Sequence, residues 1–88
     1  MRKPTFTTKF SKELKLSEKR GKDLTKIKAV MFDLICGNVL SAKHNDHALN
    51  GNYVNYRECH IEPDWLLIYK LDETEIIFAR TGTHSDLF

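Results

Sequence analysis

Residues 57–69 read Arg-Glu-Cys-His-Ile-Glu-Pro-Asp-Trp-Leu-Leu-Ile-Tyr. Residues 56–61 suit an extended chain, and the run after the corner is apolar and aromatic, as in a buried strand. Pro63 has no backbone N–H, so it belongs at the corner between two strands. The stretch predicts a hairpin that brings His60 close to Asp64. This pair could perform acid–base chemistry, because histidine titrates near neutral pH; an ordinary solvated turn is the alternative.

Two further strands are expected around this hairpin. Residues 75–80 are apolar and follow residues 65–70 after a short polar turn, which predicts a second hairpin. Residues 5–7 suit a short strand at the start of the chain. The sheet is therefore expected to be mainly antiparallel.

Two helices are predicted between the first strand and the hairpins. Thr8 or Ser11 could cap the first helix, which runs to about Arg20. Asp23 is placed to cap the second helix, and Gly37 to end it. An apolar stripe at helical spacing marks the second helix: Leu24, Ile27, Val30, Met31, Leu34 and Ile35. We expect an antiparallel helix hairpin packed on the sheet, which makes the fold class α+β.

The length and composition indicate one small domain over residues 1–88. The apolar fraction of 41% suffices for a core, and the charged fraction of 30% is typical of a soluble protein. No apolar run approaches the roughly 20 residues that span a bilayer, and no secretory signal is visible. We therefore expect a cytoplasmic protein without membrane contact. Cys36 and Cys59 are expected to be free thiols, with a disulfide as the alternative.

Charge is distributed unevenly along the chain. Residues 1–30 hold ten Lys or Arg and three Asp or Glu, whereas residues 31–88 hold four and nine. The basic part suggests contact with a polyanion, and a solvated helix surface is the alternative. The lysines on the outer faces of the two helices are Lys12, Lys15, Lys19, Lys22, Lys26 and Lys28.

Three motifs together resemble a known family. They are Asp-His-Ala-Leu-Asn-Gly at residues 46–51, the hairpin at residues 56–69, and Arg-Thr-Gly-Thr-His-Ser-Asp-Leu-Phe at residues 80–88. Their order and spacing resemble the YafQ branch of the RelE/ParE toxin superfamily. The resemblance implies a RelE-like fold and a bacterial type II toxin. Such toxins are metal-independent endoribonucleases that cut mRNA in the ribosomal A site and are silenced by an antitoxin.

The resemblance also implies site residues and partners. The implied catalytic residues are His47, His60, Asp64, Arg80 and His84, and those offered to an unstacked base are Trp65 and Phe88. The implied partners are a DinJ-like antitoxin, mRNA on the 70S ribosome and 16S rRNA, with the six helix lysines facing rRNA. Operator DNA would be bound only through the antitoxin complex. No cofactor is implied.

RNA cleavage without metal requires these residue types. The 2′-OH attacks the adjacent phosphorus, a base takes its proton, an acid protonates the leaving 5′-oxygen, and a cation meets the charge on phosphate. His84 is assigned as the acid, and Asp64, aided by His60, as the base or its orienter. His47 would hold phosphate or complete the proton network, and Arg80 would supply the permanent charge.

Three other readings stay open from the residues. The histidines and Asp64 could hold zinc, although they lack a closely spaced histidine pair. The chain could be a catalytically degenerate toxin that only binds an antitoxin in operator regulation. It could also be a ParE-type gyrase inhibitor, which shares the fold but is not expected to carry this histidine set.

Overall fold

The computed structural model describes all 88 residues, and its main feature is a five-stranded sheet in the order β1-β5-β4-β3-β2. The strands are β1 (Lys3–Phe6), β2 (His47–Ala48), β3 (Arg57–Glu62), β4 (Trp65–Leu71) and β5 (Glu75–Gly82). The helices are α1 (Thr8–Lys19), α2 (Leu24–Cys36) and α3 (His84–Leu87), with the 3-10 turns η1 (Ala42–His44) and η2 (Gly51–Tyr53). Only β1 and β5 run parallel. The predicted α+β class and mainly antiparallel sheet are confirmed.

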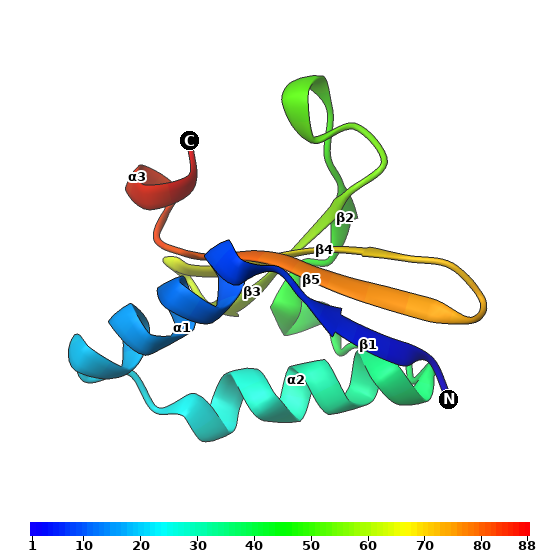
Figure 1. Ribbon diagram of the computed structural model, residues 1–88, viewed down its shortest axis with the longest axis horizontal. Coiled ribbons are helices and arrows are strands. Elements are labelled where there is room, and N and C mark those ends of the chain that lie inside the picture. Colours follow the sequence, from blue (N-terminus) through cyan, green and yellow to red (C-terminus); the bar gives the residue numbers. More distant parts are fainter.

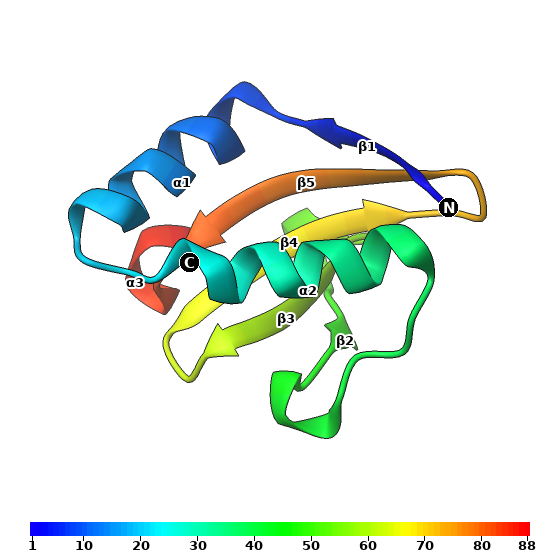
Figure 2. The same cartoon turned by 90° about the horizontal axis from the view of Figure 1, so that it is seen from below.

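The two long helices cover one face of the sheet, and α3 and the β2–η2 segment rise from the other (Figure 1). Seen from below, α1 lies beside β5 while α2 crosses the middle of the sheet in a roughly opposite direction (Figure 2). Because side chains alternate along a strand, β3 directs Cys59 and Ile61 into the main core under the helices. The same alternation sends Glu58 and His60 to the opposite face.

Local capping explains the helix boundaries. The cap of α1 is Thr7, not Thr8 or Ser11 as the sequence suggested. The Thr7 N–H donates to the Phe78 carbonyl at 3.1 Å, which keeps Thr7 extended after β1. Its hydroxyl then accepts from the Phe10 N–H at 2.9 Å. The predicted Asp23 cap and the end of α2 near residue 37 are confirmed.

The last eight residues contain the end of β5 and the short helix α3, which the sequence pattern did not predict. Thr83 and Asp86 form a capping box that starts α3. Arg20 also donates a 2.7 Å hydrogen bond to the Asp86 carboxylate, and this ion pair lowers the pKa of Asp86 to about 2. A side chain at Gly82 would lie 2.9 Å from Asp86, so only glycine fits this close approach. These contacts fix the position of His84, the first residue of α3.

Two expectations about the chain as a whole can be compared with the structure. No helix has the length and apolar character needed to cross a membrane. Both cysteines are free, as favoured from the sequence. Cys59 is fully buried in the main core, and burial raises the pKa of its thiol to about 12.

Candidate active site

Three histidines gather around a buried carboxylate on the sheet face opposite the long helices. Strand pairing places His47 beside Glu58, and His60 lies two residues further along β3 on the same face. Glu58 is 4% exposed. Its Oε1 atom lies 3.3 Å from Nε2 of His60 and 3.7 Å from Nε2 of His47. The His60 and His84 ring centroids are 5.7 Å apart.

Asp64 and His84 form the exposed part of this cluster. The Asp64 carboxylate accepts the backbone N–H of His84 at 2.9 Å and meets Nδ1 of the same residue at 2.6 Å. Both bonds hold the pKa of Asp64 below its ordinary value, and the bond from the backbone N–H has the larger effect. Since the ionised carboxylate can only accept, Nδ1 of His84 carries the hydrogen. Nε2 of His84 therefore remains for proton exchange with a bound molecule.

Arg80 is not a free cation in this structure. Its Nε and Nη2 atoms donate to the two oxygens of Glu13 at 2.8 and 2.7 Å, and Nη1 donates to the Tyr53 hydroxyl at 2.9 Å. The Glu13 bonds raise the pKa of Arg80 above its ordinary value. Both charged side chains are only about 15% exposed. The arginine thus joins α1, β5 and the η2 turn at one edge of the site.

The two predicted base-stacking residues differ in exposure. Phe88 is 64% exposed and can offer a ring face. Trp65 is 1% exposed, and its indole N–H donates to the Thr81 hydroxyl at 3.0 Å inside the sheet–helix core. The expectation that Trp65 stacks on a base is therefore corrected: its ring is enclosed because β4 is buried on both faces.

The helix lysines fall into two groups. Lys22 and Lys26 both bind the Glu62 carboxylate, at 2.8 and 2.9 Å, so much of their charge is compensated. The other four lie exposed without an ion-pair partner: Lys12, Lys15, Lys19 and Lys28. The first three of these share one face of α1, because they are spaced three and four residues apart.

Sequence reasoning missed three residues that the structure places at the site. Glu58 could have been found, because it precedes His60 by two positions in a predicted strand. Glu13 and Tyr53 gave no such signal, since each meets Arg80 only after folding. Arg57, the first residue of β3, forms an ion pair with Asp46 at 3.2 Å.

The cluster also contains a possible metal-ligand set. One ligand atom each from Glu58, His60 and His84 lie within 4.8 Å of one another. Carboxylate oxygen and imidazole nitrogen are donors that zinc and copper accept. Compared with the zinc reading from the sequence, which used the three histidines and Asp64, this set contains the buried Glu58 and lacks His47 and Asp64.

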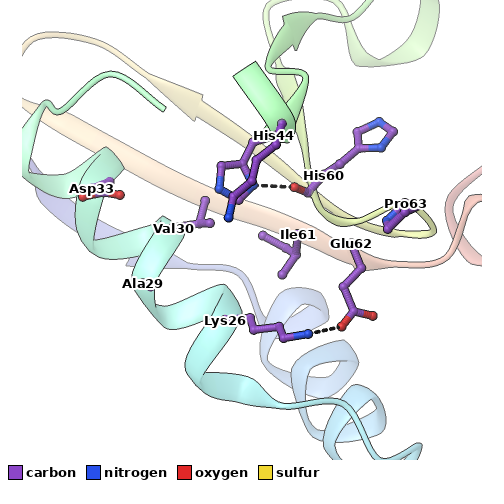
Figure 3. A pocket seen from close by; sticks show the side chains of 10 residues that line it. Lys26, Ala29, Val30, Asp33, His44, His60, Ile61, Glu62 and Pro63 are labelled. Atoms are coloured by element: carbon purple, nitrogen blue, oxygen red, sulfur yellow. Dashed lines mark hydrogen bonds and ion pairs between the residues drawn. The ribbon is translucent and has the colours of Figure 1, made fainter. Parts of the chain in front are cut away.

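A separate cavity of about 690 Å³ lies on the helix side of β3, between α2 and the β3–β4 corner. Its wall includes Lys26, Val30 and Ile61, whereas the His60 ring points away from it (Figure 3). Nδ1 of His44 contacts the His60 carbonyl at 2.7 Å across this wall. The cavity is therefore distinct from the histidine cluster.

Comparisons with known proteins agree with one another. The family described as "Bacterial toxin of type II toxin-antitoxin system, YafQ" matches residues 2–88. The chain is 46% identical over 84 residues to "mRNA interferase toxin YafQ" of Escherichia coli K12, covering 94% of this chain and 91% of the relative. Among solved structures, the "E.coli DinJ-YafQ complex" gives a TM-score of 0.94 at 45% identity over 100% of this chain and 99% of that one. A "metal-bound toxin from Helicobacter pylori" gives 0.93 at 38% identity, with both chains fully covered.

Proposed function

The chain belongs to the YafQ family of bacterial type II toxins, and from this premise we propose that it is an mRNA interferase that cuts mRNA in the A site of the ribosome. The observation that best supports this proposal is the Asp64–His84 pair. This pair leaves Nε2 of His84 accessible, and the His84 ring lies next to the His60 ring, with centroids 5.7 Å apart. The histidine cluster and the relative named as an mRNA interferase favour RNA cleavage over a gyrase-inhibiting or purely regulatory role.

The proposed reaction is transfer of the phosphate to the adjacent 2′-oxygen. His60 takes the 2′-OH proton while the 2′-oxygen bonds to phosphorus, and Glu58 stabilises the imidazolium that forms. His84 gives a proton to the 5′-oxygen as the P–O bond breaks, and Asp64 orients its ring. The products are a 2′,3′-cyclic phosphate and a 5′-OH. Asp64 is better suited to orienting than to acting as a base, because its pKa is lowered.

His47 and Arg80 are proposed to act beside this proton transfer. His47 lies at the entrance of the cluster, with its Nδ1 donating to the Asn45 carbonyl at 2.7 Å. We assign it to phosphate binding or to the proton network. Arg80 contributes its one remaining Nη1 hydrogen and anchors the neighbouring segments, because Glu13 already compensates most of its charge.

The reaction type can be tested by mapping the 5′ and 3′ ends of mRNA cut during translation with purified protein. We expect 5′-OH ends paired with 2′,3′-cyclic or 3′-phosphate ends, located within the codon that occupies the ribosomal A site. Cuts in naked RNA at the same rate would contradict ribosome dependence. Ends that carry 5′-phosphate and 3′-OH would contradict the proposed chemistry.

A further prediction concerns metal. Protein stripped with EDTA and diluted into ribosomes with their own Mg²⁺ should cut at an unchanged rate, because proton transfer and 2′-OH attack need no resident metal. Zn²⁺ or Cu²⁺ held by Glu58, His60 and His84 would compete for the proposed base and acid, so added metal should slow cleavage. Activity that disappears on stripping and returns with stoichiometric zinc would overturn the acid–base assignment.

A DinJ-like antitoxin is proposed as the partner in the cytoplasm, with operator DNA bound only through that complex. The cavity beside α2 has an apolar wall that includes Val30 and Ile61, and its charged lining holds two lysines and two carboxylates: Lys26, Lys43, Asp33 and Glu62. Its apolar wall suits the apolar face of an amphipathic segment. We expect such a segment to cover the basic helices and keep the toxin off the ribosome. Pelleting ribosomes with toxin alone and with the complex should show loss of ribosome binding in the complex. A complex that still pellets at full occupancy, without cutting, would contradict this steric account.

A further inference from the structure

An aromatic corner beside the histidine cluster joins Phe88, already implied as a base-stacking residue, to a set of side chains whose contact with RNA has not been assigned. The rings of Tyr53 and Phe88 meet edge to face, with centroids 5.8 Å apart and planes inclined at 77°. Together with Asn50, Asn52 and Leu87 they line a cavity of about 590 Å³. Leu87 is 6% exposed and closes the inner wall.

Two hydrogen bonds connect this corner to the catalytic edge. The Tyr53 hydroxyl accepts from Nη1 of Arg80 at 2.9 Å. The Phe88 N–H donates to the His84 carbonyl at 2.9 Å, so Phe88 lies one helical turn from the proposed acid. The corner is therefore tied directly to Arg80 and to the segment that carries His84.

The corner is held rigidly by its own segment. Tyr53 ends the η2 turn, and its ring also packs edge to face on Tyr56 at 6.2 Å. Gly51 takes a φ of 66°, which allows the sharp turn after which both Asn50 and Asn52 line the same cavity. A preformed aromatic wall is suited to stacking because little side-chain freedom is lost when a ring binds.

The chemistry of the wall indicates what it binds. None of the five lining residues carries a charged side chain. This excludes phosphate as the preferred ligand and favours a neutral planar group. Aromatic rings stack on nucleobases, and asparagine amides pair with their edges through one donor and one acceptor.

We propose that this corner is a nucleobase subsite in which an mRNA base next to the cut phosphate stacks on Phe88 against Tyr53. Asn50 and Asn52 read the edge of that base and thereby set the codon preference. The proposal rests on the mRNA interferase function and adds the residues that select its substrate.

The test is the distribution of cuts over all codons, mapped during translation with wild type and with the double variant Asn50→Ala/Asn52→Ala. We expect the preference at one codon position to fall by roughly tenfold, the discrimination typical of an amide–base pair. Tyr53→Phe should keep the preference, whereas Tyr53→Ala should weaken it, because the ring and not the hydroxyl contacts the base. Asn38→Ala, an exposed amide at the far end of α2, is the matched control.

The outcomes separate this inference from the function on which it rests. If wild type cuts no mRNA, the proposed function fails. If wild type cuts and the asparagine variants cut with the same codon distribution, whether faster, slower or equally fast, the subsite is wrong while the function stands. A melting curve of each variant shows whether Tyr53→Ala has lost its fold, and the asparagine pair decides the question in that case.

Discussion

Replacing His84 with glutamine is expected to lower the single-turnover rate of mRNA cleavage on saturated ribosomes by roughly 10²–10⁴-fold, the usual contribution of a general acid. Glutamine retains a polar group of similar reach, and its backbone N–H can still donate to Asp64. Its amide cannot deliver a proton to the 5′-oxygen. Ribosome binding should barely change, because His84 begins α3, which rises from the sheet face opposite the two long helices (Figure 1).

This prediction is checked by measuring cleavage rate and ribosome affinity on the same preparations. His44→Gln is the matched control, since it removes a histidine whose ring forms its hydrogen bond with a backbone carbonyl, that of His60, and not with a side chain of the cluster. We expect that control to cut within a few-fold of wild type. A His84→Gln protein that cuts at the wild-type rate would remove His84 from the chemistry, and equal losses in both variants would point to a structural effect.

The fold could be predicted from the sequence because its signals are local. The apolar run from Trp65, the proline corner and the caps at Asp23 and Gly37 each act within a few residues of themselves. The two misjudged places depend on distant partners. Thr7 becomes the α1 cap because β5 keeps it extended. α3 depends on Gly82 and on the contact of Asp86 with Arg20.

The site could be predicted only in part, for the same physical reason. The family motifs indicated the histidines and Asp64, and the structure brings them to one sheet face. They could not show that Glu13, 67 residues away from Arg80, would compensate its charge. Nor could a strand pattern show that β4 is buried on both faces, which encloses Trp65 and leaves Phe88 as the exposed ring.

The second large effect is expected from the lysines of α1. Lys12, Lys15 and Lys19 lie exposed on one face of the helix without an ion-pair partner. If that face docks on ribosomal RNA, replacing all three with glutamine should weaken ribosome binding and lower the salt slope of the affinity by about three units, about one for each lost phosphate contact. The cleavage rate at saturating protein should stay near the wild-type value, because no catalytic side chain contacts these lysines.

Lys22 and Lys26 provide the matched control, because Glu62 already compensates part of their charge. The double variant Lys22→Gln/Lys26→Gln replaces two lysines in place of three and leaves Glu62 unpaired, so its salt slope should fall by less per replaced lysine than the α1 variant's. Affinities measured from about 50 to 200 mM salt separate the two cases, since counterion release makes the slope proportional to the number of phosphate contacts. If both variants bind like wild type across the series, α1 does not face RNA. If the control loses as much slope per replaced lysine as the α1 variant, the contact surface extends to Lys22 and Lys26, and the ion pairs with Glu62 must open when the ribosome is bound.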